Sequence, residues 1–479
     1  MLRRALVWLA FAALLAPVAA DAGKAGEAKA RRVSTARSGR PAPKVRASAR
    51  VPGRDRRAVG RRLARYRHVV ISVRDARGMG DVAAAYLTAV DMVTRLGYQG
   101  TITIATPTAA KSDEPRQKLE HLAGERISRD GTLAGGRIRV IGLDRVPADL
   151  PAVDLYIAAS GVTAAVDAPD SLPIHDATVF VGQSVFGNTA GGADAGLARV
   201  GDRTFEMAGP GVAAGEGGVY ADPVALALRG RSRAHVHRVV RESVNRVRPA
   251  RSRRALAELL DGRGLPGARR GVAYGGLSTP ALSNQVATYL RGLVDDAGAA
   301  DRSYALVVPK ALDRRLLTWP GLRGHVEAID VAAGQRLPRR ATPGTVYLLV
   351  MDPLPHEVFV GMMALADAPP LIAGDGALSA AVLLRRPFVV ASIEHNEKNN
   401  RAFYDRLLSA SALDHDPVLE RIFVPQPAAA PWKYDIDAST ALELVSPRYQ
   451  AIFAAAGRSI GTLTDHLVLS ADAARRAAR

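Results

Sequence analysis

Two glycine turns are the candidates for phosphate binding in this chain. The first reads "GMGD" at residues 78–81, after an apolar run, and contains Gly78, Gly80 and Asp81. The second reads "GDGALS" at residues 374–379. In both, glycine lets a ligand approach the backbone, and a helix that begins there offers free N–H groups to an anion. A tight strand-to-helix connection capped by Asp81 is the alternative interpretation of the first turn.

The second turn is followed by small residues that leave room for a ligand. Gly374, Asp375, Gly376, Ala377 and Leu378 are followed by Ser379, whose hydroxyl adds a donor to the free N–H groups of the helix start. The carboxylate at position 375 suits the positive end of a helix, but it repels a phosphate bound to the same groups. It can instead accept hydrogen bonds from sugar hydroxyls.

Polar residues follow two further apolar runs of the second half. Glu394, His395 and Asn396 begin the densest polar cluster there, after the run 387–391, and His356 follows the run 344–351. Asn396, Asn399 and Asn400 of this cluster can each both donate and accept hydrogen bonds, which suits a ligand rich in hydroxyls. A helix start, in which these residues cap the helix and face water, is the other interpretation.

Several chemistries find no support in the residue patterns. The chain has no cysteine, and therefore no disulfide and no thiolate site. It contains no H-E-x-x-H, no G-x-S-x-G and no G-x-x-x-x-G-K-[ST] pattern. A dinucleotide site after the first glycine turn needs an acidic residue at the end of the next strand. That strand ends with Ala105-Thr106-Pro107, which contains no acid. No metal and no cofactor are expected.

Apolar runs of strand length alternate with helical patterns, which predicts an α/β fold with parallel sheets covered by helices. The runs are 68–73, 101–105, 137–142, 154–159 and 177–181, then 270–275, 303–309, 344–351, 370–373 and 387–391. Helices are expected at 82–96, 223–247 and 252–260, loops at 182–218 and a hinge at 262–267. We therefore predict a Rossmann-like domain at 67–262, a second at 263–436 and C-terminal helices at 437–479. In such folds ligands bind beyond the carboxyl ends of the strands.

The N-terminal residues differ in composition from the rest. Residues 1–22 combine two arginines, an apolar run and a small-residue exit, which predicts a signal peptide and hence a periplasmic or secreted protein, with an uncleaved membrane anchor as the alternative. Residues 23–66 contain fifteen Lys or Arg against two acids, so +13 of the net charge of +19 lies there. We expect this segment to be a disordered linker that contacts anionic membrane or envelope polyanions, or serves only as a spacer. The charge indicates no specific nucleic-acid partner.

The segment "GDGALSAAVLLRRPFVVASIEHNEKNN" (374–400) resembles the donor region of GT-B superfamily glycosyltransferases. The similarity is to the peptidoglycan N-acetylglucosaminyltransferase and to the protein-arginine rhamnosyltransferase of bacteria. It implies two Rossmann-like domains that face a cleft, a donor diphosphate on residues 374–379, and Glu394, His395 and Asn396 beside the sugar. The loop "GMGD" resembles the acceptor-side glycine loop of these enzymes. By that resemblance Asp81, with Asp75 as second choice, is the general base.

Two functions follow from these observations. The first is transfer of a sugar from a diphosphate-linked donor, nucleotide or lipid, to a glycan or protein acceptor in the envelope or outside the cell. The second is a non-catalytic exported protein that keeps the cleft and binds a glycan or a partner. The polar rim favours transfer, whereas the export signal favours binding, because nucleotide sugars are made in the cytoplasm. An epimerase of the same fold is a further alternative.

Overall fold

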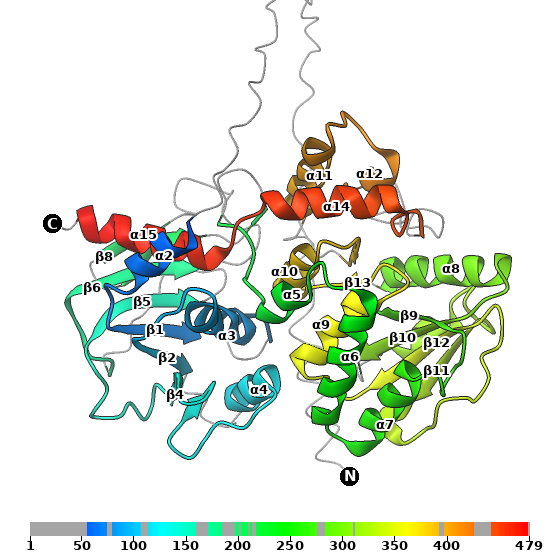
Figure 1. The fold of residues 1–479 in the computed structure, drawn as a ribbon, viewed down its shortest axis with the longest axis horizontal. Coiled ribbons are helices and arrows are strands. Elements are labelled where there is room, and N and C mark those ends of the chain that lie inside the picture. The colour runs from blue at the N-terminus through cyan, green and yellow to red at the C-terminus, as the bar shows by residue number, and fades with distance from the viewer. Residues whose placement is uncertain are drawn as a thin grey trace, which may run out of the picture. The chain divides into compact units, whose positions relative to one another are not determined.

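The computed structural model describes most of the chain beyond the N-terminal segment. The described residues are 55–73, 79–106, 114–159, 171–183, 197–200, 203–208, 211–212, 217–274, 283–309, 312–391, 397–425 and 442–477. Two largely parallel sheets and the helices that cover them form the described part (Figure 1). The predicted fold class, α/β with two Rossmann-like sheets, is confirmed.

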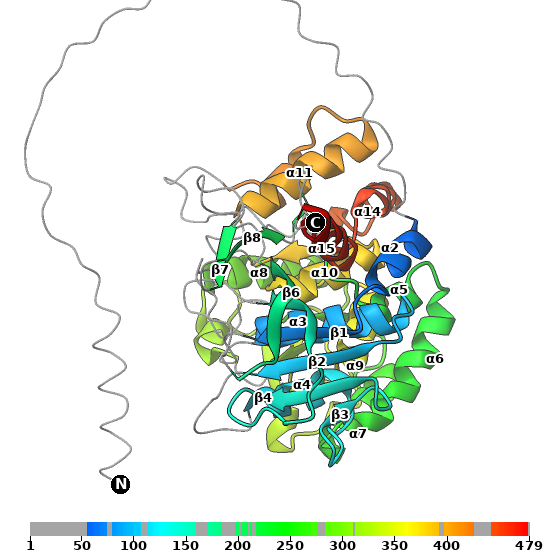
Figure 2. The ribbon, with the colours of Figure 1, turned by 90° about the vertical axis from the view of Figure 1, so that its left-hand side faces the viewer.

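The first sheet has eight strands in the order β3-β4-β2-β1-β5-β6-β8-β7. Their bounds are β1 His68–Val73, β2 Thr101–Thr106, β3 Thr132–Leu133, β4 Ile138–Gly142, β5 Val153–Ala159, β6 Ile174–Gln183, β7 Leu197–Val200 and β8 Arg203–Ala208. All pairings are parallel except β3 with β4 and β7 with β8. Every residue of β1 is buried, as expected for a central strand covered on both faces. Figure 2 shows β1, β2 and β4 side by side.

Helices near this sheet come from both ends of the chain. They are α2 (Arg56–Leu63), α3 (Met79–Thr94), α4 (Glu114–Ala123) and α15 (Leu463–Ala477). The last helix packs on α2 and β6, so the C-terminus returns to the first sheet (Figure 1). Arg95 anchors this return, because its guanidinium donates to Asp91 of α3 and to Asp465 of α15, each at 2.6 Å.

The second sheet has four strands in the order β11-β12-β10-β9, all parallel. A parallel bridge from Ala273 to Leu371 joins its edge to the pair β13-β14. The bounds are β9 Arg269–Val272, β10 Tyr304–Pro309, β11 Val326–Asp330, β12 Val346–Met351, β13 Leu371–Ile372 and β14 Val389–Val390. From β9 the chain continues on one side, with β10 next to β9, β11 at the edge and β12 between them. It then crosses to the other side of β9 and forms β13. The position between β9 and β13 is a topological switch point, where ligands bind in sheets of this kind.

The second sheet is accompanied by the remaining helices. They are α5 (Pro223–Leu228), α6 (Arg233–Ser243), α7 (Ala250–Leu260), α8 (Ser283–Ala299), α9 (His356–Leu365), α10 (Asp375–Leu384), α11 (Glu397–Ser411), α12 (Pro417–Phe423) and α14 (Pro447–Ser459). Helices α5 and α6 pack on α9, which lies beyond the expected hinge in sequence. The rings of Phe388, Phe403, Phe423 and Phe453 form one cluster that holds α11, α12 and α14 together.

Three local predictions differ from the structure. Residues 56–63, assigned to a disordered linker, form α2, because Val59 and Leu63 share one buried face although the composition around them is polar. The expected loops at 182–218 contain the antiparallel pair β7-β8. The helix expected at 223–247 is divided at Gly230, which has a positive φ of 69° and ends α5. Within the described ranges, every helix is too short or too polar to span a bilayer.

Candidate functional site

A cavity of about 250 Å³ lies at the carboxyl ends of the second sheet's strands. The strands β9, β10 and β12 contribute Val272, Val308 and Met351 to its wall. Ala83 and Leu87 of α3, together with residues of α4, line it from the first sheet's side. The lining is mostly apolar, and its polar side chains are those of His121, Tyr274, Asp352 and His356, which is the usual composition of a small-molecule site.

The glycine turn forms part of this cavity at the topological switch point. Gly374, Gly376 and Ala377 line it at the start of α10. Gly374 has φ +82° and ψ 152°, a conformation that is essentially restricted to glycine. A Cβ built at Gly376 would have no atom within 4 Å, so open space lies above the first turn of the helix. Free N–H groups at a helix start beside open space suit an anion.

Two predicted residues of the same turn face away from this space. Leu378 and Ser379 are both buried, and neither is among the described residues that line the cavity. The Ser379 Oγ accepts a hydrogen bond of 3.2 Å from the backbone N–H of Tyr220, which precedes α5. The hydroxyl therefore fixes α10 against the segment before α5.

His356 lines the cavity from the first position of α9, and it is held by a carboxylate 134 positions away in sequence. Its Nε2 lies 2.6 Å from Oδ2 of Asp222, a residue with no exposed surface. The other oxygen, Oδ1, accepts from the N–H groups of Val224 and Ala225 and so caps α5. The carboxylate thus orients the imidazole and keeps the second ring nitrogen, Nδ1, available.

The pair is charged because the two partners stabilise each other's ionised form. Burial alone raises the pKa of a carboxyl, but the His356 imidazolium and the two backbone N–H groups hold the pKa of Asp222 below its usual range. Burial alone lowers the pKa of a histidine, but Asp222 outweighs it and raises the pKa of His356. The coupling therefore favours the imidazolium form of His356 at the cavity.

A second histidine, His121 of α4, lines the cavity from the opposite side. Burial lowers its pKa, a backbone hydrogen bond to Leu354 partly offsets this, and the charge of His356 lowers it further. His121 is therefore neutral at pH 7 and can accept a proton. It also lines a smaller polar pocket of about 210 Å³ with Arg246 and Arg248, so it stands between the two spaces.

Aromatic surface and an unpaired amide lie on the carboxyl side of the same sheet. Tyr274, 46% exposed, packs its ring 4.9 Å from that of Phe359, and both line the cavity. Such a pair can stack on a base or on the apolar face of a sugar. Asn399, in the first turn of α11 after β14, is 2% exposed, and neither of its amide atoms has a hydrogen-bond partner among the described residues, which exclude 392–396.

The remaining predicted site residues lie at or beyond the limits of the described chain. Asp81 and Gly80 belong to the first turn of α3, the helix that contributes Ala83 and Leu87, but the Asp81 side chain is outside the described part. The same holds for the Asp375 side chain, at the first position of α10. Gly78, Glu394, His395 and Asn396 fall outside the described residues altogether.

Sequence reasoning missed three residues that line or support the cavity. Asp222 precedes a proline in "ADP", a typical helix-cap pattern. Nothing in the sequence indicates that its carboxylate also contacts His356. His121 lies in an ordinary amphipathic helix. Tyr274 lies near the end of the run 270–275 that was predicted as a strand. Its place at the carboxyl end of that strand was the only sign that it could face a ligand. The described side chains contain no group of three or more His, Asp or Glu arranged to hold a metal ion.

Comparison with known proteins identifies similar folds but no family. No family model matches the chain, and no curated protein sequence does. The N-terminal domain of Candida albicans trehalose-6-phosphate phosphatase is similar over 84% of this chain and 95% of its own, at 8% identity and a TM-score of 0.41. A Veillonella parvula glycosyl transferase of family 9 matches over 68% and 80%, at 9% identity and a TM-score of 0.31.

A third similar structure is described as trehalose-6-phosphate from E. coli bound with UDP-2-fluoro glucose. It covers 86% of this chain and 97% of its own, at 9% identity and a TM-score of 0.37. The chain is structurally similar to these proteins at low sequence identity and at TM-scores below 0.5. The matches therefore assign it neither a family nor an activity.

Proposed function

We propose that this protein is an exported glycosyltransferase of the GT-B type. It transfers a sugar from a diphosphate-linked donor to an acceptor in the envelope or outside the cell. The observation that carries the proposal is the cavity at the switch point of the second sheet. There the start of α10 and the imidazolium of His356 line one space.

The donor diphosphate is assigned to the start of α10. A leaving diphosphate gains negative charge during transfer, and a catalyst must stabilise that charge. We assign the N–H groups near Gly376 and the Nδ1–H of His356 as its donors, while Asp352, which lines the same cavity, acts against them. Asp222 holds the imidazole in place, so little reorganisation is needed when the charge develops. The Tyr274–Phe359 ring pair, which lines the cavity, is assigned to the nucleoside of a nucleotide donor.

Inverting transfer also needs a base that takes the proton of the acceptor hydroxyl. Asp81 at the start of α3 remains our first candidate, since this helix lines the cavity through Ala83 and Leu87. His121 is the second, because it is neutral and stands between the cavity and the polar pocket. The acceptor then enters from the pocket lined by Arg246 and Arg248.

A non-catalytic role is the second candidate function, and one observation favours it. No lysine or arginine is among the described residues that line the cavity, so a diphosphate would depend on helix N–H groups and one imidazolium. A protein that only binds a glycan needs no such cations. The aromatic pair and the apolar wall are compatible with that role.

A thermal-shift experiment separates the two. The full chain is titrated with UDP, GDP, dTDP and the corresponding nucleotide sugars, and a ligand at 100 times Kd should stabilise by about 2.7 kcal/mol. Gly376→Leu places a side chain into the open space above α10 and should abolish this shift. Gly298→Leu in α8, where an added Cβ also meets no atom within 4 Å, is the matched control.

The outcome assigns the function. A shift that disappears in Gly376→Leu but persists in Gly298→Leu supports the donor site. A shift that survives Gly376→Leu places the nucleotide elsewhere and refutes the site. No shift with any nucleotide, together with binding to isolated envelope glycans, refutes a nucleotide donor and favours the non-catalytic role.

A further inference from the structure

Helices α2 and α15 lie side by side, and together they bring three arginines to one carboxylate (Figure 1). Guanidinium nitrogens of Arg62, Arg65 and Arg476 lie 3.2, 2.7 and 3.5 Å from the carboxylate oxygens of Asp472. The Asp472 side chain is 2% exposed, whereas the arginine side chains are 34%, 56% and 63% exposed. One carboxylate neutralises one cation, so two positive charges remain within a small area of the surface.

The exposed side of α2 extends this cluster. Arg57, Arg61 and Arg65 are exposed and follow one another every four residues, so they lie along one side of the helix and the turn that ends it. Val59 and Leu63, at the positions between them, are buried on the other side. The helix therefore packs on the fold by its apolar side and presents a row of guanidinium groups to the solvent.

A further arginine is held in place at the end of α15. The Nη1 of Arg475 donates to the backbone oxygen of Arg65 at 3.2 Å, and its guanidinium lies over the ring of Tyr66, 5.4 Å from the ring centre. An arginine fixed by such contacts loses less freedom on binding than a mobile one does. We call the surface that these residues form the basic face; its members are Arg57, Arg61, Arg62, Arg65, Arg475 and Arg476.

The charge of the basic face continues into the chain that precedes it. Residues 55–65 and 470–477 contain seven arginines against Asp55 and Asp472, which leaves a charge of +5. The segment 23–54 leads directly into α2 and contains ten Lys or Arg against Glu27, which adds +9. The folded face and the segment that enters it therefore attract the same kind of partner.

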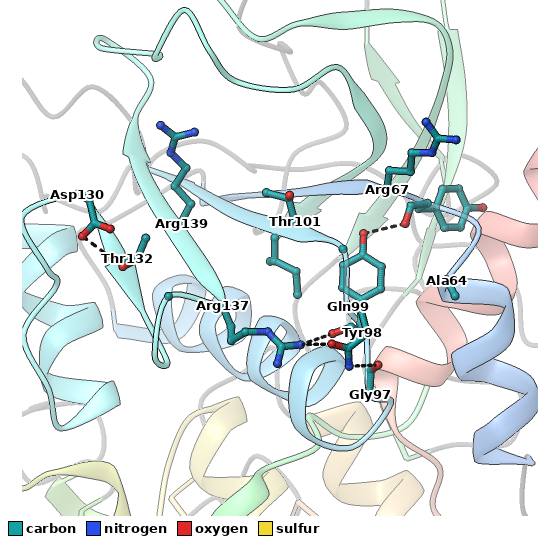
Figure 3. A pocket seen from close by; sticks show the side chains of 14 residues that line it. Ala64, Arg67, Gly97, Tyr98, Gln99, Thr101, Asp130, Thr132, Arg137 and Arg139 are labelled. Atoms are coloured by element: carbon teal, nitrogen blue, oxygen red, sulfur yellow. Dashed lines mark hydrogen bonds between the residues drawn. The ribbon is translucent and has the colours of Figure 1, made fainter.

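The basic face borders a groove of about 760 Å³, which Ala64 lines after α2. Arg67 and Arg137 also line this groove, but Figure 3 shows their guanidinium groups pointing apart. Arg137 turns toward Tyr98 and Gln99, whose oxygens accept its hydrogen bonds at 2.7 and 3.3 Å. The groove's charges are therefore spread in different directions, unlike the row along α2.

We propose that the basic face is a docking surface for an anionic lipid membrane. Lipid headgroups spread negative charge over a plane, so exposed cations on two neighbouring helices can engage several headgroups at once. Each guanidinium fork can bind its own phosphate oxygens, and no two arginines must meet at one phosphate.

The composition of the face favours lipid over single-stranded nucleic acid, which stacks its bases on exposed aromatic rings. Tyr66, the ring at this face, is 2% exposed. Within the described chain, the exposed large apolar side chain is that of Tyr274, which lies at the second sheet. Attachment by the described face therefore rests on charge, and it should weaken as salt screens that charge.

Docking by the basic face does not involve the candidate site. None of the six arginines is among the described residues that line the cavity of the second sheet. Membrane docking is therefore independent of the proposed transfer, and either can fail without the other.

The test measures co-sedimentation of the full chain with vesicles of phosphatidylglycerol in phosphatidylcholine, and pure phosphatidylcholine is the reference. In Arg57→Gln/Arg61→Gln the fold should be unaffected, because Arg57 has no side-chain partner among the described residues and Arg61 has a 3.9 Å pair with the exposed Asp55. Arg339→Gln/Arg340→Gln removes two exposed charges between β11 and β12 and is the matched control. Each basic residue near an anionic surface changes binding about fivefold, so the first double variant should weaken it about thirtyfold and the control should not.

Asp472→Asn tests the face in the opposite direction. It removes a negative charge and leaves the arginines, so it should strengthen vesicle binding about fivefold while its unfolding midpoint falls. Unchanged or weaker binding by this variant, in its folded state, contradicts the proposal. Where Asp472→Asn does not fold, the two double variants decide.

A selective, salt-sensitive loss in Arg57→Gln/Arg61→Gln supports the membrane as partner. Equal vesicle binding by the two double variants overturns the proposal, because the segment before α2 then accounts for the attachment. A DNA duplex is the competing probe. A loss of DNA binding at unchanged vesicle binding overturns the lipid assignment and gives the face to a nucleic acid.

Discussion

Replacing His356 by asparagine is expected to destabilise the folded chain, because it leaves a buried carboxylate without its cation. The Nε2 of His356 lies 2.6 Å from Oδ2 of Asp222, which has no exposed surface. Removing one partner of a buried ion pair costs about 3–5 kcal/mol. Two backbone N–H groups still donate to Oδ1 of Asp222 in the variant, so we expect a loss of about 3 kcal/mol, toward the lower end of that range.

The loss should depend on pH in a defined direction. The pKa of His356 is raised in the folded state, so its contribution is complete below the unfolded pKa of about 6.5 and is lost as the pH rises through the raised value. The pKa of Asp222 is lowered, so its contribution is present above about pH 3.9 and is lost as the pH falls through the lowered value. The difference between wild type and variant should therefore be largest between about pH 4 and 6.5 and should shrink at higher pH.

Urea unfolding midpoints of four proteins between pH 5 and 9 provide the measurement. They are the wild type, His356→Asn, Asp222→Asn and the double variant. Asparagine at position 222 retains an oxygen that can cap α5, so Asp222→Asn removes the charge but not the cap. The double variant should lose less than the two single losses combined, by about 0.5–3 kcal/mol. A destabilisation that is constant with pH, or losses that simply add, would refute the ion pair.

Two further substitutions test how the site and its supports are built. Ser379→Ala removes the hydroxyl that accepts a hydrogen bond from the Tyr220 N–H, so the free energy of unfolding should fall by about 1–3 kcal/mol. The affinity for nucleotides should not change. A loss of affinity at unchanged stability would instead assign the hydroxyl to the ligand. Arg95→Met leaves two buried aspartates without their cation and should lower stability by about 3–5 kcal/mol. It should also speed proteolytic removal of α15, and unchanged proteolysis would show that this helix is held by its apolar contacts.

Much of the fold could be predicted from the sequence because strands buried on both faces leave a strong local pattern. The run 68–73 is β1 with the same bounds, and the runs 101–105 and 303–309 are strands to within one residue. Strand β11 was missed because its sequence "VEAID" mixes charged and apolar residues and only two of its five positions are buried. Helix α2 was missed because the average composition of a basic segment conceals two apolar positions one turn apart.

The site was only partly predictable, for a physical reason. A glycine turn after a strand is a local feature, so residues 374–377 were identifiable, and the structure places Gly374, Gly376 and Ala377 at a cavity. Their role in binding a donor stays a prediction. The contacts of Ser379 were not predictable, because the Tyr220 N–H that it accepts from is 159 positions away.

By itself, the sequence determined the α/β alternation, the two parallel sheets and the position of the glycine turn, since each depends on residues that are neighbours in the chain. Only the tertiary structure decided which charges meet. Asp222 comes to His356 because α5 packs on α9, and Arg95 comes to Asp465 because α15 packs on α3. Electrostatic interactions depend on distance in space, and chain folding sets that distance independently of separation in sequence.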